Sequence, residues 1–527
     1  MTIPPPIQRD IRTRAAYSEG AGIHRIVPAG VAVPRSPEDV RALVRWAAES
    51  GATLVPRGAG SAMPGNAVGA GIVVDMSQGF HRLDVDPGRR VALTGGSVTW
   101  AALTTAAREH GLRLPPDPSS GPFATAGGMV ATNAAGPRSV RHGSVRPWVT
   151  GLEVVGADGE ARWIRRGGGS REPGAGLPFR LDEPGRRLVA ERFPKTRKNS
   201  MGYALDAFVD SGDEVDLFVG AEGTLGIVTT VEWRLDSIPP HRAGATLGFA
   251  TLDGLQEAVT FLVTLRPSAV ELMDETLLRF VVESGGAVPS GLAALLLVEF
   301  ERDTAAAARG AVADAVRGLR ALTSHVETAP DAAGLEGLWR VRSLASPALA
   351  RLPETRRSLQ VIEDGCVPLD RLGAYLAGVR AAADRLDIAV ALFGHAGDGH
   401  VHVNALPDVT RTGWREAVRA LYDAVSDLVI GLGGTPAGEH GAGRLRAGLV
   451  ERLYGAEIVA RFRAVKTAYD PGGVFNPGVI LPADDWEPLA QIKLGPAAAP
   501  IPDDIAARLR DLERSGAWQT PKTELAR

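Results

Sequence analysis

The sequence predicts a mixed helix and strand protein of two or three domains. Its 527 residues are several times the length of a typical domain of about 150 residues. Short apolar runs alternate with glycine-rich turns as far as about Leu235, and Pro239 and Pro240 then break this pattern. From there to about Gly431, helical patterns mix with a few apolar strands such as residues 294–300. The change of pattern indicates a domain boundary near residue 239.

Composition places the chain among ordinary globular proteins and excludes several functions. Hydrophobic residues make up 45% and charged residues 23% of the chain. The balance of 58 basic against 61 acidic residues leaves a net charge of −3, which predicts no nucleic-acid-binding surface. Cys366 is the single cysteine, so the chain forms no internal disulfide and holds no zinc or iron–sulfur cluster by cysteines. Redox chemistry would therefore use an organic cofactor or a bound metal.

No stretch of the sequence is apolar enough to cross a membrane. The longest apolar run, residues 292–298, is far shorter than the roughly 20 residues that a bilayer requires. The first residues, Met-Thr-Ile-Pro-Pro-Pro, lack a basic stretch followed by an apolar core, so we expect no signal peptide. We expect a cytoplasmic protein that is not transmembrane, and we leave peripheral membrane association open.

The first helix is expected directly after Ser36. A capping serine, Pro37 at the first helical position and two acids in the first turn are typical of a helix start, and Gly51 is a typical helix end. Two short apolar strands follow, at residues 52–55 and 72–74, with a glycine-rich loop between them. Residues 167–197 are rich in glycine, proline and arginine and predict an exposed insertion.

Two helices are expected in the last quarter of the chain. Apolar residues repeat at spacings of three and four after Gly413 until Gly431 ends the pattern. Beyond Asp484 the chain is punctuated by prolines and contains one short amphipathic helix, whose apolar face consists of Ile505, Leu509 and Leu512. We expect these last residues to form an appendage.

Four loops concentrate small residues, at residues 55–61, 115–120, 124–136 and 220–227. Backbone N–H groups that no side chain covers bind phosphate. For one loop alone, a tight strand connection in which glycine supplies a positive φ is the better interpretation. Four such loops favour close backbone approach to a flat or extended ligand. No Gly-x-Gly-x-x-Gly follows a strand, so the ordinary dinucleotide-binding fold is not predicted.

Four of the ten histidines lie in two short stretches. Residues 393–404 read Phe-Gly-His-Ala-Gly-Asp-Gly-His-Val-His-Val-Asn, and residues 438–441 read Gly-Glu-His-Gly. His400 and His402 would share one face of a strand, and the turn after His395 could fold that residue back toward His402. Imidazoles and a carboxylate are common zinc ligands, and a catalytic zinc keeps one position open. The alternative, buried histidines with satisfied hydrogen bonds, is less favoured for four histidines among so many glycines.

The order of these motifs resembles that of the FAD-linked oxidases of the vanillyl-alcohol oxidase type, in the D-lactate, glycolate and D-2-hydroxyglutarate dehydrogenase branch. The motifs are the four loops, the segment Lys-Asn-Ser-Met-Gly-Tyr at residues 198–203, the two histidine stretches and Phe-Asn-Pro-Gly at residues 475–478. The resemblance implies an α+β fold with a PCMH-type FAD-binding domain of two subdomains and an antiparallel-sheet cap domain. The implied segments are an N-terminal extension (1–26), the FAD-binding domain (27–238), the cap domain returning to the flavin site (239–482) and a C-terminal appendage (483–527).

The resemblance also implies which residues bind FAD. Several family members attach the flavin to a histidine, and His142 lies in a suitable region, but its surroundings match no such motif and we expect non-covalent FAD. The residues expected to bind FAD are Pro56, Arg57, Gly58, Ala59, Gly60, Ser61, Gly65, Asn66, Pro116, Ser119, Thr125, Gly128, Ala131, Asn133, Gly143, Glu222, Gly223 and Ile227.

The activity implied by the resemblance is oxidation of a D-2-hydroxy acid to the 2-oxo acid, with hydride transfer to flavin N5. His440 is expected to accept the hydroxyl proton, which suits an unperturbed imidazole pKa of about 6.5. His395, His402 and Glu439 are expected to hold a divalent metal, Zn²⁺ before Mn²⁺ or Fe²⁺, that acts as a Lewis acid. Arg342 is expected to bind the substrate carboxylate and to take part in catalysis. The other residues expected in the substrate pocket are Ser346, Asn404, His400 and Asn476.

One departure from the family leaves the substrate open. Dehydrogenases of dicarboxylic hydroxy acids can carry a lysine where this chain has Ile362 and Glu363. Arg444 and Arg446 could replace that lysine or could be ion-pairing residues. Lactate-like, glycolate-like and longer acids therefore all stay open.

The electron acceptor and the function itself each have alternatives. Electrons could leave through an iron–sulfur, quinone or flavoprotein partner, or to oxygen. The alternative functions are a non-catalytic FAD-binding subunit of a larger dehydrogenase and a metal-dependent hydrolase without flavin.

Overall fold

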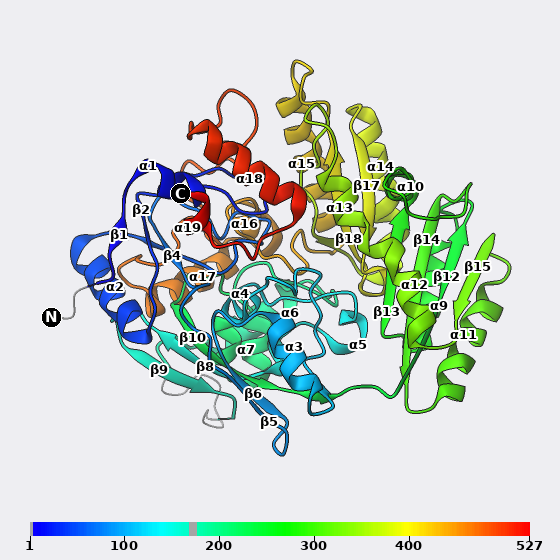
Figure 1. Ribbon diagram of the computed structural model, residues 1–527, viewed down its shortest axis with the longest axis horizontal. Coiled ribbons are helices and arrows are strands. Elements are labelled where there is room, and N and C mark those ends of the chain that lie inside the picture. Colours follow the sequence, from blue (N-terminus) through cyan, green and yellow to red (C-terminus); the bar gives the residue numbers. More distant parts are fainter. Residues whose placement is uncertain (1–3, 168–176) are drawn as a thin grey trace.

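The structure is a computed structural model that describes residues 4–167 and 177–527 (Figure 1). The N-terminal half contains two sheets. The first has the order β1-β2-β4-β3 and is parallel except for β1. Its strands are β1 (Ile7–Gln8), β2 (Gly30–Ala32), β4 (Ile72–Asp75) and β3 (Leu54–Arg57). The expected helix after Ser36 is confirmed as α2 (Pro37–Ser50), whose apolar side packs on this sheet.

The second sheet is antiparallel and has the order β5-β6-β10-β8-β9. Its strands are β5 (Leu83–Asp86), β6 (Val91–Gly95), β10 (Ile227–Arg234), β8 (Val149–Val155) and β9 (Ala161–Arg165). Alternate residues of β10 are buried, which is the pattern of a sheet with one face on the core. The helices of this region are α3 (Trp100–Arg108), α4 (Ala126–Thr132), α5 (Ser139–His142), α6 (Glu183–Arg192), α7 (Leu205–Ser211) and α8 (Val215–Phe218). Of the expected exposed insertion, residues 168–176 lie outside the described residues, and α6 occupies part of the rest.

A two-stranded pair, β7 (Leu112–Arg113) and β11 (Asp236–Ser237), leads into the cap, a seven-stranded sheet with the order β15-β12-β14-β13-β17-β18-β16. Every pairing in the cap sheet is antiparallel. Its strands are β12 (His241–Phe249), β13 (Ala269–Asp274), β14 (Ala294–Arg302), β15 (His325–Ala329), β16 (Gly365–Cys366), β17 (Ala389–Gly394) and β18 (His400–Leu406). The apolar run at residues 294–300 is thus a central strand, and both of its faces are buried.

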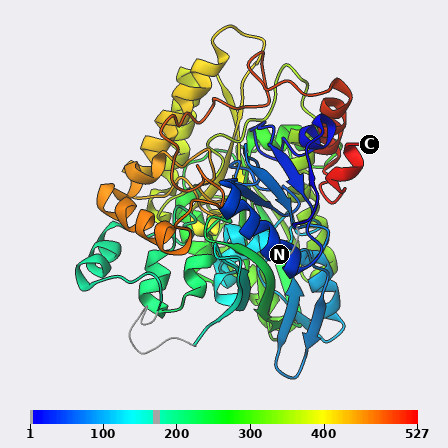
Figure 2. The same cartoon turned by 90° about the vertical axis from the view of Figure 1, so that its left-hand side faces the viewer.

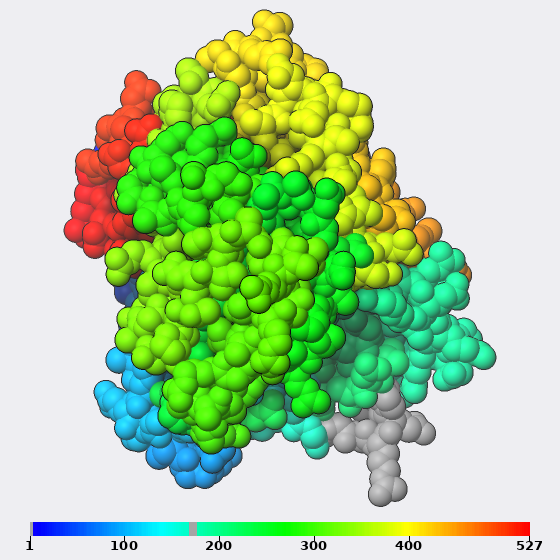
Figure 3. Space-filling model, turned by 90° about the vertical axis from the view of Figure 1, so that its right-hand side faces the viewer, coloured from blue at the N-terminus to red at the C-terminus, as the bar shows by residue number. Residues whose placement is uncertain are grey.

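Helices cover both faces of the cap sheet. Figure 3 shows the outer side of this part of the molecule, where the green and yellow-green residues of the cap form most of the surface. One face packs against α9 (Leu255–Thr264), α11 (Ala305–Leu319) and α14 (Leu372–Arg385). The other packs against α10 (Glu275–Glu283), α12 (Ala332–Ser343) and α13 (Ala345–Ala350). The expected helix after Gly413 is confirmed as α15 (Trp414–Gly431), which packs on α14.

Ion pairs join the cap to the N-terminal half. Glu299 and Glu301 of β14 are buried, and each accepts two hydrogen bonds from one arginine of the N-terminal half. Arg138 reaches Glu299 at 2.8 and 2.7 Å, and Arg113 reaches Glu301 at 2.6 and 2.8 Å. Bidentate arginine–carboxylate pairs fix orientation as well as distance, so the cap sheet is held at a defined angle.

The chain then returns to the N-terminal half through α16 (Leu449–Tyr454) and α17 (Ala456–Tyr469) and ends in α18 (Asp503–Ser515) and α19 (Lys522–Leu525). The amphipathic helix expected at Ile505, Leu509 and Leu512 is confirmed as α18, with these three residues buried. The segment does not extend away from the fold: α18 contacts both α1 (Ile11–Ala16) and α13, and α19 contacts α1 (Figure 2). Within the described part of the chain, no helix is both long and apolar enough to span a bilayer.

Candidate active site

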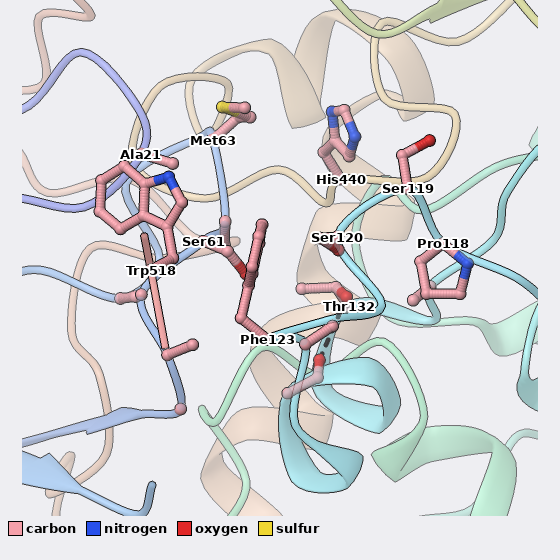
Figure 4. A pocket seen from close by; sticks show the side chains of 18 of the residues that line it. Ala21, Ser61, Met63, Pro118, Ser119, Ser120, Phe123, Thr132, His440 and Trp518 are labelled. Carbon is pink, nitrogen blue, oxygen red and sulfur yellow. Dashed lines mark hydrogen bonds between the residues drawn. The ribbon is translucent and has the colours of Figure 1, made fainter. Parts of the chain in front are cut away.

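A cavity of about 850 Å³ is lined by residues of the N-terminal half, the cap and α18. Figure 4 shows part of its wall, including Ser61, Ser119, His440 and Trp518. Most of the residues expected to bind FAD line the cavity. They are Pro56, Arg57, Gly58, Ala59, Gly60, Ser61, Asn66, Ser119, Thr125, Gly128, Ala131, Glu222, Gly223 and Ile227. The four loops of small residues, far apart in sequence, therefore share one wall.

Four residues expected at the FAD site lie outside this wall, and each shapes a loop behind it. Gly65 packs on the ring of His24, and the carbonyl of Pro116 accepts a hydrogen bond from Trp100 Nε1 at 2.6 Å. Asn133 ends α4 in the left-handed conformation and accepts from the Arg146 amide at 3.2 Å. Gly143 ends α5 with a φ of 70°.

The first loop is fixed by Arg57, whose side chain points into the protein. Its guanidinium donates to the carbonyl oxygens of Tyr17 (3.2 Å), Glu19 (2.8 Å) and Ala67 (3.3 Å). A Cβ at Gly60 would lie 2.3 Å from this guanidinium, so only glycine fits there. The arginine thus shapes the loop from behind, and the loop presents its backbone to the cavity.

The loops approach one another closely enough to form a narrow cradle. A Cβ at Gly58 would lie 2.3 Å from Thr125 Oγ1, and this hydroxyl accepts from the Gly128 amide at 3.2 Å at the start of α4. Asn66 Oδ1 is buried and has no partner among the described residues. A cavity of about 850 Å³ that is walled by bare backbone, with a partnerless amide oxygen buried beside it, fits a flavin dinucleotide. His142 Nε2 lies 3.0 Å from Glu301 Oε2, and His142 does not line the cavity.

At the other end of the cavity, three imidazoles converge on one carboxylate oxygen. Glu439 Oε1 lies 3.2 Å from His395 Nε2, 3.5 Å from His402 Nε2 and 3.6 Å from His440 Nε2. His402 and His440 stack with ring centroids 5.3 Å apart. His402, Glu439 and His440 line the cavity, whereas His395 lies behind them and is 2% exposed.

The second nitrogen of each of these imidazoles is held by another group. His395 Nδ1 lies 2.6 Å from Glu271 Oε1, His402 Nδ1 lies 2.9 Å from the Glu363 carbonyl oxygen, and His440 Nδ1 lies 2.6 Å from Glu363 Oε2. Outer partners of this kind fix the tautomer and orientation of metal-binding histidines. The donor set therefore fits a divalent metal on His395, His402 and Glu439, with His440 beside it.

Lys198 lies beneath the cluster, and sequence analysis assigned it no role. Its ammonium is buried, 2.7 Å from Glu439 Oε2, 3.4 Å from His400 Nδ1 and 3.6 Å from Asp398 Oδ2. The ammonium pairs with Oε2 of Glu439, and the imidazoles lie around Oε1. The only sequence signal was its place in the Lys-Asn-Ser-Met-Gly-Tyr segment.

Charges shift the pKa values of the cluster. Burial opposes the charged form of His440, but Glu363 and Asp364 outweigh it and raise the pKa of His440 to about 10. The expected unperturbed imidazole is therefore wrong, because sequence analysis did not place these two acids against the ring. Burial likewise opposes ionisation of Glu439, yet Lys198 and nearby histidines hold its pKa well below the usual range.

His400 does not line the cavity, although it was expected in the substrate pocket. It is fully buried, with Nε2 2.9 Å from Asp364 Oδ1, and its ring lies against Gly438. Burial lowers its pKa to about 3, so the ring is neutral and packs beneath the Gly-Glu-His-Gly turn. Both predicted strand positions are confirmed, because His400 and His402 lie on β18.

Arg342 lines the cavity on the cap side. Its Nε donates to Glu271 Oε2 at 2.8 Å, and its guanidinium lies over the ring of Phe393 at 4.8 Å. Among the described residues its two terminal nitrogens have no hydrogen-bond partner, so they are available to a ligand carboxylate. Ser346 and Asn404 also line the cavity.

Asn476, Arg444 and Arg446 do not line the cavity. Asn476 donates to the carbonyl oxygens of Asn66 and Glu222, both at 2.9 Å, and so joins two loops of the cofactor end. Arg444 binds the Val68 and Pro477 carbonyl oxygens. Arg446 pairs with Glu363 and donates to the Gly441 carbonyl at 2.8 Å. Both arginines were candidates for a second carboxylate anchor, and both are hydrogen-bonded to other protein groups instead.

Comparison with known proteins gives the family. A model described as FAD linked oxidases, C-terminal domain, matches residues 238–480, and one described as FAD binding domain matches residues 28–165. The D-lactate dehydrogenase of Archaeoglobus fulgidus is 30% identical over 86% of this chain and 91% of its own length. The glycolate oxidase subunit GlcD of Bacillus subtilis is 28% identical over 89% of this chain and 93% of its own length.

Solved structures agree on the fold. The 4-ethylphenol oxidase of Gulosibacter chungangensis superposes with a TM-score of 0.66 at 15% identity, over 90% of this chain and 94% of that one. An alkyldihydroxyacetonephosphate synthase gives 0.63 at 15% identity, over 90% and 87% of the two chains. The chain belongs to the FAD-linked oxidase family, and the predicted PCMH-type FAD-binding domain with its antiparallel-sheet cap is confirmed.

Proposed function

We propose that this protein oxidises a D-2-hydroxy acid to the corresponding 2-oxo acid. The observation that carries the proposal is that the glycine-loop cradle and the histidine–carboxylate cluster open into the same cavity. The relatives named above are a D-lactate dehydrogenase and a glycolate oxidase subunit, and the substrate class follows theirs. FAD bound in the cradle supplies the acceptor for the hydride from C2.

The side chains of the cap orient the substrate. The free nitrogens of Arg342 bind its carboxylate in a bidentate way, and Glu271 fixes that arginine through Nε. Phe393 packs under the guanidinium and keeps the arginine flat against the wall. Because Glu271 also holds His395 at 2.6 Å, one buried acid sets the positions of the carboxylate anchor and of the cluster.

His440 accepts the hydroxyl proton at Nε2, since Glu363 occupies Nδ1. The carboxylate of Glu363 stabilises the imidazolium that forms, much as a buried acid does beside a catalytic histidine. A divalent metal held by His395, His402 and Glu439 would polarise the hydroxyl and favour the neutral form of His440. Because one cysteine cannot hold an iron–sulfur cluster, the proposal passes the electrons to a separate iron–sulfur, quinone or flavoprotein partner or to oxygen.

An anaerobic reduction screen tests the proposal. Purified flavin-loaded protein is mixed with matched D- and L-2-hydroxy acids, and the visible flavin absorbance is followed. We expect bleaching by D-acids with release of the 2-oxo acid. A protein without flavin absorbance would favour the hydrolase, and a flavin that no hydroxy acid bleaches would favour the non-catalytic subunit.

A further inference from the structure

The C-terminal helix adds charged side chains to the wall of the cavity. The match to the family model ends at residue 480, and α18 lies beyond it. Arg510, Glu513, Arg514 and Trp518 line the cavity. Figure 1 shows α18 in red, crossing from α1 toward α13, and both contacts are present. A segment outside the matched domains thus contributes to the site.

In this region four cations share two carboxylates. Glu513 lies 2.8 Å from Arg357, 3.1 Å from Lys493 and 3.3 Å from Arg510. Glu354 lies 2.7 Å from Arg510, 2.5 Å from Arg514 and 3.7 Å from Arg357. The group therefore carries a net charge of 4 − 2 = +2. Its three arginines all line the cavity, with the side chains of Arg357 and Arg510 largely buried and that of Arg514 43% exposed.

The cationic group adjoins the proposed substrate pocket. Arg357 precedes Ser358, whose hydroxyl donates to Asn404 Oδ1 at 2.9 Å. Ser358 and Asn404 line the cavity together with Gln360 and Arg342. Arg357 is itself 8% exposed, so an anion that reached it would be largely removed from water.

We propose that Arg357, Arg510 and Arg514 form an anion subsite that binds a second carboxylate at the far end of the substrate. The subsite would favour hydroxy acids with an acidic tail over lactate-like and glycolate-like acids. This inference rests on the proposed function, because Arg342 is taken to bind the carboxylate next to the oxidised carbon. A planar guanidinium can donate two parallel hydrogen bonds to a carboxylate, and Glu354 and Glu513 fix the positions of the guanidinium groups.

Equilibrium binding tests the subsite without turnover. Glutarate and butyrate, which differ in one terminal carboxylate and carry no oxidisable hydroxyl, are titrated into the oxidised holoenzyme while the flavin spectrum is recorded. We expect glutarate to bind at least about tenfold more tightly than butyrate. The double variant Arg510→Gln/Arg514→Gln should reduce this ratio to about two or less, and Arg357→Gln should do the same.

Two matched controls separate charge from folding. Arg508→Gln changes an exposed arginine of the same helix that does not line the cavity, and it should keep the ratio. Arg510→Lys/Arg514→Lys keeps the charges on α18 and should keep most of the preference for glutarate. Loss of the preference in the glutamine variant together with its retention in the lysine variant supports the subsite.

Several results would overturn the subsite. Equal affinity for glutarate and butyrate in the unmodified protein is one, and an unchanged ratio in both glutamine variants is another. A reduced FAD content of the double variant, with an unchanged ratio in the fraction that still holds FAD, would assign the arginines to the cofactor instead. Discrimination between glutarate and butyrate without bleaching by any hydroxy acid would leave the subsite standing and reject the proposed function.

Discussion

The two ends of the cavity hold their ligands by different means. At the cofactor end the wall is backbone: Gly58 and Gly60 leave no room for a Cβ, and Arg57 braces the loop from behind. At the histidine end the wall is made of buried side chains, in which Glu439 and Glu363 each contact several cations or imidazoles. A cofactor that binds the same way in every turnover can be held by shape, whereas moving a proton needs groups that change charge. The two ends should therefore respond differently to mutation.

The largest effect is expected at the histidine end. His440→Ala should slow flavin reduction by about 10²–10⁴-fold, because it removes the proposed base. FAD should stay bound, since His440 is not among the residues expected to bind FAD. The measurement is anaerobic stopped-flow absorbance beside the FAD content, with exposed His110→Ala as the control. An undiminished rate in His440→Ala would remove this residue from the base role.

At the cofactor end, a mutation should weaken FAD binding and leave the metal site intact. In Gly58→Val the added side chain would overlap Thr125 Oγ1, so FAD should bind about 10- to 100-fold more weakly. Metal content should not change. Equilibrium dialysis with FAD and elemental analysis measure the two quantities. Gly310→Ala, on an open helix surface, is the matched control. Unchanged FAD affinity in Gly58→Val would mean that the cradle is not the flavin site.

A third change addresses the buried acid that links the metal cluster to the substrate anchor. Glu271→Gln should lower metal affinity or activity by about 10–100-fold, because Glu271 orients His395 from behind. Metal retained after dialysis against a chelator is the measurement, and re-addition of Zn²⁺ or Mn²⁺ should restore flavin reduction. Full turnover in metal-free protein would make the histidines structural.

The smallest effect concerns the C-terminal segment. Burial and Arg57 lower the pKa of Lys522 to about 7, well below the ordinary lysine value of about 10.4. Between these values the unfolded chain binds a proton that the folded chain does not, so stability should rise with pH, by at most about 1.4 kcal/mol per unit. Denaturant unfolding from pH 7 to 9 should show this rise in the unmodified protein relative to Lys522→Met. Parallel profiles would contradict the burial of a neutral lysine.

Sequence patterns predicted what depends on local order. Ser36, Pro37 and Gly51 mark the ends of a helix, and the repeat after Gly413 marks another, because caps and apolar spacing act within a few residues. The glycine loops and the histidine stretches were found for the same reason. Their arrangement around one cavity was implied by the family resemblance and could not be derived from spacing.

The sequence did not reveal the partners that come from distant elements. Glu271 lies on β13 and Lys198 on a loop more than two hundred residues before Glu439, so no local pattern links them to the histidines. The pKa of His440 depends on such partners and was misjudged. The segment after residue 483 was interpreted as an appendage. Its helix was predicted, but the packing of that helix on α1 and α13 involves elements far away in the sequence.

The central claim is that the two ends of the cavity serve one oxidation, and a deuterium isotope effect on anaerobic flavin bleaching tests it most directly. The holoenzyme is mixed in a stopped-flow instrument with a D-2-hydroxy acid that it oxidises, carrying either hydrogen or deuterium at C2. We expect slower bleaching with the deuterated acid, and bleaching too slow to compare in His440→Ala. Bleaching at equal rates with both isotopes and in both proteins would contradict hydride transfer from C2 assisted by the histidine end.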